Sequence, residues 1–173
     1  MPGAGDYHAS VIALGIDPGT ATTGFGVVAL QRGRLRLVDA GCITTSPLAG
    51  HGGRLEALHR ALDELIAEHR PQLVAVERLF FQRNVRTAMA VAEARGVALL
   101  TAAQRGLPVD EPTPNEVKIA VCGHGTAAKD QVAAMVRRLL GAPLDGAADD
   151  ATDALALAIG GLYRAAGAPL EAR

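Results

Sequence analysis

Residues 11–30 have the sequence VIALGIDPGTATTGFGVVAL. The apolar run Val11–Ile16 ends at Asp17-Pro18-Gly19, a turn signal, and Gly24–Leu30 is predicted to be the second strand of a hairpin. Arg34–Ile43 alternates in polarity and predicts a third strand. The folded part of the chain is therefore expected to begin with three antiparallel strands, the first of which ends at an acidic residue.

Helices and further strands are expected to follow this sheet. Leucines at helical spacing predict a helix over Arg54–His69, and Leu73–Glu77 is predicted to be a buried strand that ends in a carboxylate. The remaining expected elements are a helix from a cap at Asn84 or Thr87 to about Ala103, a short strand at Leu107–Glu111, and helices at Thr113–Cys122, Lys129–Leu140 and Asp149–Ala166. This order predicts an α/β fold, an RNase H-like mixed five-stranded sheet with helices on both faces.

The length of 173 residues fits one domain with an ample core. We expect a disordered N-terminal extension over residues 1–10, a folded domain over 11–166 and a short tail over 167–173. Cys42 and Cys122 lack the spacing of a zinc site or a disulfide framework. The sequence has neither a signal peptide nor an apolar run long enough to span a membrane, so a cytoplasmic location is expected.

The charge is unevenly distributed along the chain. A formal net charge of -1 argues against a general polyanion binder. However, the segment from Arg78 to Arg95 is rich in arginine, and Lys118 and Lys129 are the only lysines. A local basic surface is therefore compatible with a net charge of -1 for the whole chain.

Four acidic residues are candidates for one site: Asp17, Glu77, Asp150 and Asp153. Asp17 also suits a turn, and aspartates that begin a helix commonly cap it or favour its positive end. Glu77 is harder to explain structurally, because a charge that closes a buried strand needs a partner or a metal. Asp150 and Asp153 are three residues apart, so both can point from one helix face toward the sheet edge where the other two end.

A cluster of carboxylates without histidine or cysteine suits Mg²⁺ or Mn²⁺ better than zinc. In two-metal nucleases, one ion activates water and the other stabilises the leaving oxygen of the phosphodiester. Without metal, mutual repulsion is expected to raise one or more carboxyl pKa values. Such a site should gain stability when it binds metal.

Four blocks in matching order resemble the RuvC family of crossover junction endodeoxyribonucleases. They are Gly15–Val28 (GIDPGTATTGFGVV), Val76–Asn84 (VERLFFQRN), Glu93–Val97 (EARGV) and Asp149–Ile159 (DDATDALALAI). The resemblance covers about Val11 to Tyr163. It implies a homodimer that resolves four-way Holliday junctions with paired nicks, which leave 5′-phosphate and 3′-hydroxyl ends, in partnership with the RuvA and RuvB branch-migration complex.

The resemblance also implies roles for individual residues. Asp17, Glu77, Asp150 and Asp153 would be catalytic and bind two Mg²⁺ or Mn²⁺ ions, although the neighbouring Asp149 leaves a one-residue ambiguity in the register. Phe80 and Phe81 would form an aromatic wedge at the junction centre, whereas burial of both in the core is the alternative. The other expected DNA contacts are Arg78, Arg83, Asn84, Arg86, Lys118 and Lys129, with a solvated charged surface as the alternative for the basic residues.

Three other functions remain as competing hypotheses. The acid-Gly-Thr pattern of the first turn also resembles ATPases of the actin and sugar-kinase superfamily, but this chain is too short for their two lobes. A RuvX/YqgF-like RNA-processing nuclease would share the opening motif, but the VERLFF block and the late D-x-x-D pair favour RuvC. A catalytically inactive junction-binding module would not need all four carboxylates.

Overall fold

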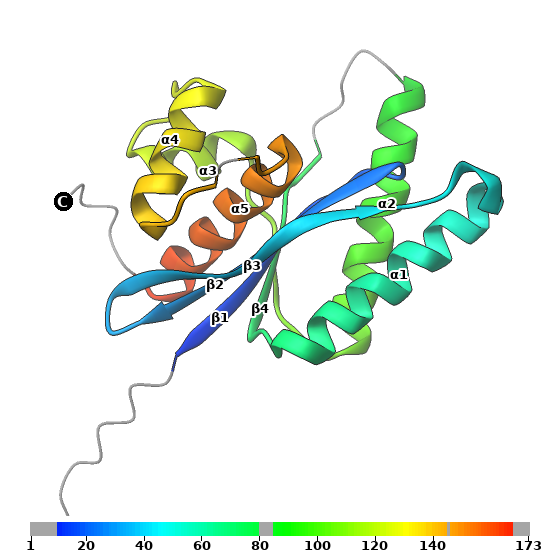
Figure 1. Cartoon of the computed structure of the whole chain (residues 1–173), viewed down its shortest axis with the longest axis horizontal. Helices are drawn as coiled ribbons and strands as arrows, with labels where there is room; N and C mark the ends of the chain where they lie inside the picture. The colour runs from blue at the N-terminus through cyan, green and yellow to red at the C-terminus, as the bar shows by residue number, and fades with distance from the viewer. Residues whose placement is uncertain (1–9, 80–84, 145, 168–173) are drawn as a thin grey trace, which may run out of the picture.

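The computed structural model describes residues 10–79, 85–144 and 146–167, and the side chains of residues 85–87 are not described. Five strands form one sheet in the order β3-β2-β1-β4-β5 (Figure 1). Their bounds are Val11–Asp17 for β1, Thr22–Gln31 for β2, Arg34–Thr44 for β3, Leu73–Val76 for β4 and Val109–Asp110 for β5. The β1–β2 and β2–β3 pairs are antiparallel, and the β1–β4 and β4–β5 pairs are parallel. The predicted mixed five-stranded sheet is confirmed.

Helices cover both faces of this sheet (Figure 1). The helices α1 (Gly50–His69) and α2 (Val85–Gln104) lie on one face, and α3 (Pro114–Cys122), α4 (Lys129–Leu140) and α5 (Asp149–Ala165) lie on the other. Each face has its own hydrophobic core. Residues such as Leu14, Ile16 and Val76 pack with α1 and α2, whereas Ala13 and Ala75 pack with α3, α4 and α5.

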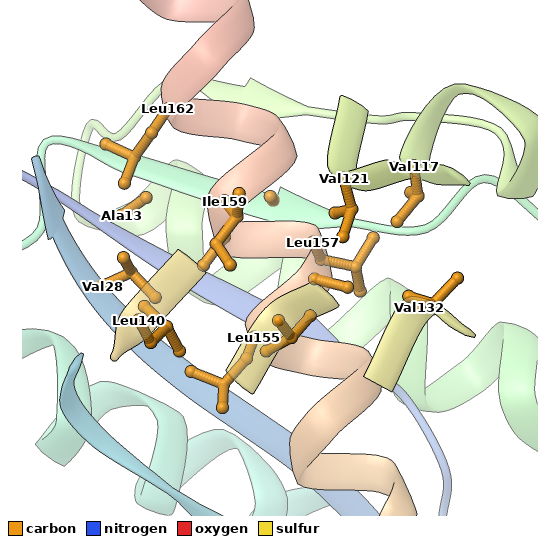
Figure 2. Packing of buried hydrophobic residues seen from close by; sticks show 14 of the residues in the cluster. Ala13, Val28, Val117, Val121, Val132, Leu140, Leu155, Leu157, Ile159 and Leu162 are labelled. Carbon is orange, nitrogen blue, oxygen red and sulfur yellow. The ribbon is translucent and has the colours of Figure 1, made fainter. Parts of the chain in front are cut away.

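The core beneath α5 is built from small and branched residues of several elements. Figure 2 shows Leu155, Ile159 and Leu162 of α5 with Val28 of the sheet and Leu140 of α4 around them. Nearly every residue of α5 from Ala151 to Leu162 is buried, apart from the half-buried Asp153. This helix is therefore central to the domain, and a polar residue on it needs a functional or structural partner.

The element boundaries differ from the sequence predictions at several positions. The strand predicted over Leu73–Glu77 ends at Val76, and only Val109–Asp110 of the predicted Leu107–Glu111 pairs as a strand. The first helix begins at Gly50 instead of Arg54, because a short 3₁₀ turn (Pro47–Ala49, capped by Ser46) leads directly into it. The α2 helix begins at Val85, which excludes Thr87 as its cap, and the other candidate, Asn84, lies outside the described residues. The α5 N-cap is Ala148, so no aspartate caps this helix.

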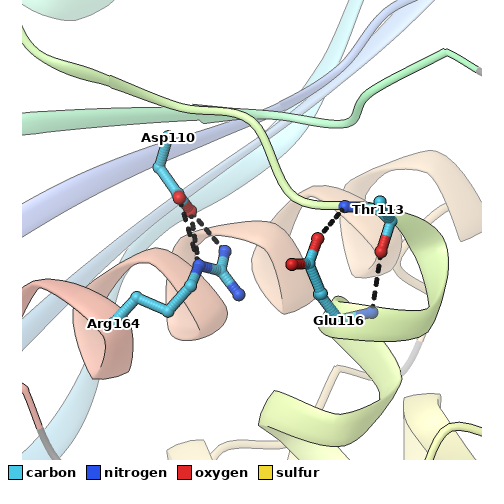
Figure 3. Close-up of polar contacts among 4 residues, drawn as sticks. All are labelled: Asp110, Thr113, Glu116 and Arg164. Atoms are coloured by element: carbon cyan, nitrogen blue, oxygen red, sulfur yellow. Dashed lines mark hydrogen bonds and ion pairs between the residues drawn. The ribbon is translucent and has the colours of Figure 1, made fainter.

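The connection between β5 and α3 is anchored at both ends (Figure 3). At its start, Asp110 accepts hydrogen bonds from Arg164 near the end of α5, including one of 3.0 Å from Nε. At its end, Thr113 caps α3: its hydroxyl accepts from the Glu116 backbone, while the Glu116 carboxylate accepts from the Thr113 backbone at 2.7 Å. Residues 111 and 112 therefore lie between two fixed points.

No helix in the described part of the chain is long and apolar enough to cross a membrane.

Candidate active site

The parallel pairing of β1 and β4 places Asp17 and Glu77 side by side. Ile16 pairs with Val76, so the residue that follows each of them, Asp17 or Glu77, lies at the same end of the sheet. Ile16 and Val76 both face α1 and α2. Because successive side chains of a strand alternate between faces, Asp17 and Glu77 are directed toward the α5 face.

Glycines of β1 and β2 allow α5 to approach this edge at backbone distance. A Cβ atom on Gly15 would lie 1.9 Å from the Ala154 carbonyl oxygen, and one on Gly24 would lie 2.1 Å from the Asp150 carbonyl oxygen. Only residues without a side chain permit such close packing. The first turns of α5, which carry Asp150 and Asp153, are thereby held over the end of β1.

A cavity of about 230 Å³ opens where these elements meet. Three of the four candidate carboxylates line it, Asp17, Glu77 and Asp153, together with both lysines of the chain, Lys118 and Lys129. The rest of its wall is mainly apolar, from Pro114, Val117, Val132, Ala156 and Leu157. The structure therefore brings together five predicted site residues that come from five different segments of the sequence.

The carboxylates of this cavity repel one another. Burial, followed by the charges of Asp153, Asp150 and Glu77, raises the pKa of Asp17 to about 7, against a smaller opposing effect of Lys129. Burial and the charge of Asp153 also raise the pKa of Glu77. Paired and partly buried carboxyl groups hold protons tightly for this reason. A cation in the cavity would relieve both effects.

Lys129 supplies part of that positive charge. Its Nζ atom lies 3.1 Å from Asp153 Oδ2 and 3.4 Å from Asp149 Oδ2. The hydrogen bond and charge of Asp153, with a smaller contribution from Asp149, raise the pKa of Lys129. Asp149 is thus oriented toward Lys129 and its side chain is 83% exposed, whereas Asp150 contributes to the field at Asp17 without lining the cavity.

The donor set fits a hard divalent cation. It consists of carboxylate oxygens from the ends of two strands and from α5, and the cavity lining contains no thiolate or imidazole. Among the described residues, no three His, Cys, Asp or Glu side chains already stand in an arrangement that could hold one ion. The side chains of Asp17, Glu77 and Asp153 would therefore need to adjust their rotamers around a bound ion.

Most of the predicted DNA contacts lie outside the described residues. Phe80, Phe81, Arg83 and Asn84 lie outside the described residues, as does the side chain of Arg86. Arg78 is described and exposed, and it directly follows Glu77. The predicted wedge segment therefore connects the candidate site to the start of α2.

Arg95 is a neighbour of the site for which the sequence predicts no individual role. It donates a hydrogen bond of 2.9 Å from Nε to the backbone carbonyl of Glu77. The sequence contains a signal for such a contact, because Arg95 stands in a helix whose surrounding residues are mostly Ala, Val, Gly and Leu. A lone arginine in an apolar stretch commonly has a buried polar partner.

The family model of "Crossover junction endodeoxyribonuclease RuvC" matches residues 13–161. The chain belongs to the RuvC family. A RuvC of Pelotomaculum thermopropionicum is 51% identical over 149 residues, which are 86% of this chain and 91% of that protein. A RuvC of Chloroflexus aurantiacus is 52% identical over 153 residues, which are 88% of this chain and 93% of that protein.

A solved RuvC structure has the same fold. The Thermus thermophilus RuvC in complex with its Holliday junction substrate is 35% identical to this chain, with a TM-score of 0.81. The match covers 91% of this chain and 96% of the other. The RuvC family resemblance and the RNase H-like fold that the sequence predicts are both confirmed, and the chain is a crossover junction endodeoxyribonuclease by family.

Proposed function

We propose that this chain resolves four-way Holliday junctions by hydrolysing one phosphodiester bond in each of two strands, in recombination and DNA repair. The observation that carries the proposal is the cavity in which Asp17, Glu77 and Asp153 face Lys118 and Lys129. Carboxylates and ammonium groups in one cavity suit a reaction in which a cation and a phosphate must lie side by side.

Asp17, Glu77, Asp150 and Asp153 are the residues that would hold divalent metal, with Mg²⁺ or Mn²⁺ as the ions and two per site as the expected number. The bound ions would supply an activated water and stabilise the leaving 3′-oxygen, so that the products carry 5′-phosphate and 3′-hydroxyl ends. Three of these residues line the cavity, and Asp150 is close enough to it for its charge to raise the pKa of Asp17.

The two lysines would orient the scissile phosphate. Lys118 on α3 and Lys129 at the start of α4 line the cavity together with the carboxylates. Their ammonium groups can each donate to a non-bridging phosphate oxygen. In this arrangement, the scissile phosphate would lie at the cavity beside Lys118 and Lys129.

The junction centre would be engaged by the segment that links Glu77 to α2. Phe80 and Phe81 are proposed to stack on bases there, and Arg78, Arg83, Asn84 and Arg86 are proposed to contact the neighbouring backbone. Support comes from the position of this segment in the chain, since it begins at a cavity residue. It follows that unpaired bases would be held close to the cleaved bond.

A homodimer would place two such cavities on one junction. Met89 and Leu100 on α2 are 60% and 54% exposed, and the exposed Ala92, Gly96 and Ala103 lie between or beside them at helical spacing. A helix face that is exposed and apolar except for Glu93 supports a protein contact, and a two-fold dimer presents identical sites to two like strands. The RuvA and RuvB branch-migration complex is the proposed partner of this dimer.

The test is cleavage of a synthetic mobile four-way junction and a matched linear duplex in Mg²⁺, Mn²⁺ or EDTA, read on a denaturing gel. Paired nicks that need the divalent ion and occur only in the junction support the proposal. Asp17→Asn should bind the junction without cleaving it, because it removes a metal-binding charge with little change of shape. Binding without cleavage by the unaltered protein would instead favour an inactive junction-binding module.

A further inference from the structure

Arg95 connects three elements behind the cavity. From α2, its Nε atom donates to the Glu77 carbonyl at 2.9 Å, and its Nη2 atom pairs with Glu111 on the connection between β5 and α3. Its side chain is only 16% exposed, whereas that of Glu111 is 40% exposed. A guanidinium that is largely buried and uses two different nitrogens on two partners is held in one orientation.

These contacts fix a single peptide group. The carbonyl of Glu77 and the N–H of Arg78 belong to the same planar peptide unit. The carbonyl accepts from Arg95, and the N–H donates to the Pro112 carbonyl at 2.8 Å. Glu77 follows the last residue of β4, so these two contacts continue to hold the chain where the strand has ended.

The partner side of this arrangement is itself rigid. Glu111 and Pro112 lie between Asp110, which is paired with Arg164, and Thr113, which caps α3 (Figure 3). Because Glu111 and Pro112 are held in place, their contacts with Arg95 and with the Arg78 N–H also hold Glu77 in place. Fixing the peptide plane also limits the directions that the Cα–Cβ bond of Glu77 can take, and thereby the direction of its carboxylate.

We propose that Arg95 is a positioning residue that holds the Glu77 backbone so that its carboxylate enters the cavity ready to bind a divalent cation. The inference rests on the proposed function, since it concerns a residue of the proposed metal site. Arg95 touches neither the DNA nor the cation in this role. It acts through the backbone of Glu77, and Glu111 holds Arg95 in turn.

Lysine cannot replace arginine here. An ammonium group is a single point on a flexible chain, so it cannot satisfy the Glu77 carbonyl and the Glu111 carboxylate from two fixed positions as the guanidinium does. Arg95→Lys keeps the charge and most of the apolar stem. It therefore tests the geometry of the contact with little change in the electrostatic field.

The matched control is Arg105→Lys. Arg105 follows α2 and uses the same two nitrogen atoms on one carboxylate, that of Asp63, at 2.6 and 2.5 Å. This pair is remote from the cavity, which it does not line. The same substitution is thus made in two similar contacts, of which one touches Glu77.

The experiment measures Mn²⁺ binding by calorimetry, junction affinity in EDTA, cleavage as a function of Mn²⁺ concentration, and the thermal unfolding midpoint. Arg95→Lys should weaken Mn²⁺ binding by about 10–100-fold, as loss of a residue that orients a metal ligand commonly does, with unchanged junction affinity. Excess Mn²⁺ should restore its cleavage, because the carboxylate is still present. Glu77→Gln should not be restored, and Arg105→Lys should resemble the unaltered protein.

Two results would overturn the inference. One is Mn²⁺ binding by Arg95→Lys equal to that of Arg105→Lys, and the other is a cleavage defect that Mn²⁺ does not relieve in a folded protein. If Arg95→Lys does not fold, Glu111→Ala is the variant to measure, because Glu111 is partly exposed and its loss leaves the Arg95 guanidinium without its second partner. Weaker Mn²⁺ binding by Glu111→Ala supports the inference. Unchanged Mn²⁺ binding refutes it. Failure of the unaltered protein to bind Mn²⁺ or cleave would refute the proposed function instead.

Discussion

Gly15 of β1 and Gly26 of β2 face each other in the antiparallel ladder, and α5 lies directly on both. A Cβ atom on Gly15 would be 1.9 Å from the Ala154 carbonyl oxygen, and one on Gly26 would be 2.7 Å from the Leu155 nitrogen. The pair forms a flat area in the sheet on which a helix backbone can rest. The distance between Asp17 on the sheet and Asp153 on the helix depends on this area.

Gly15→Ala should destabilise the protein and impair the site. The obstacle is backbone, which a side-chain rotation cannot relieve, so we expect a loss of about 3 kcal/mol in the free energy of unfolding. The displaced α5 should also weaken divalent-ion binding. Urea denaturation and Mn²⁺ calorimetry check both effects.

Gly52→Ala is the matched control for that substitution. Gly52 lies in α1 with nothing within 4 Å of an added Cβ. Alanine there should leave stability unchanged or raise it by roughly 0.5–1 kcal/mol, because it favours the helix. Equal stability of the two variants would mean that close packing of α5 on Gly15 is not required.

The order of elements could be predicted because each carries a local pattern. The periodicity of α1, the apolar run of β4 and the Thr113 cap of α3 are readable without tertiary information. The early start of α1 at Gly50 was missed, since three glycines in its first turn conceal it and the preceding 3₁₀ turn supports it. Glycine has low helix propensity, and only the neighbouring structure overrides it.

The acidic residues of the candidate site could be predicted from the sequence, but the contacts that position them could not. Strand ends and helix faces suffice to bring Asp17, Glu77 and Asp153 together. The contact of Arg95 with the Glu77 carbonyl joins residues 18 positions apart and depends on how α2 returns to the sheet. The sequence pattern also could not separate Asp149 from Asp150, because both lie in the first turn of α5 and only the packing on Gly24 distinguishes them.

The raised pKa of Asp17 predicts how stability depends on pH without metal. The folded protein holds the Asp17 proton up to about pH 7, whereas an unfolded chain releases it near its ordinary pKa of 3.8. The folded state binds the proton more tightly, so the stabilisation present at low pH is lost as the pH rises toward and through 7. In EDTA, Asp17→Asn should therefore gain stability relative to the unaltered protein, by roughly 1–4 kcal/mol at pH 8.

Urea denaturation of both proteins between pH 4 and pH 8 measures that difference. Mg²⁺ should stabilise the unaltered protein at pH 8 and have much less effect on Asp17→Asn, because binding to the folded state alone raises stability. Parallel stability curves across this pH range would show that the Asp17 carboxyl is not destabilised by its neighbours.

Asp149 and Asp153 should differ strongly although Lys129 contacts both. The Asp149 side chain is 83% exposed, and exposed ion pairs contribute little, so Asp149→Asn should keep cleavage within about threefold. Asp153 lines the cavity, and Asp153→Asn should lose cleavage and divalent-ion binding. Rates from the junction assay and Mn²⁺ calorimetry compare the two variants. Loss of Mn²⁺ binding in Asp149→Asn would make Asp149, in place of Asp150, the metal ligand.

The exposed face of α2 that contains Met89 and Leu100 is predicted to form the contact between the two subunits of a dimer. In a two-fold dimer built on this face, Leu100→Asp would bring a new carboxylate of each subunit into the apolar contact, where both are desolvated and repel each other. Analytical ultracentrifugation should show a monomer. The monomer should still nick junction strands singly, because each cavity is formed within one chain, but it should lose coordinated double nicking.

Leu48→Asp is the control for that substitution, since Leu48 is 95% exposed in the 3₁₀ turn before α1 and lies on a different element. It introduces the same charge at another exposed leucine and should leave a dimer with paired nicks. A dimeric Leu100→Asp variant would place the contact on another surface. A monomeric variant that still made coordinated nicks would contradict the symmetry argument itself, because two independent active sites would then suffice to cut both strands of one junction together.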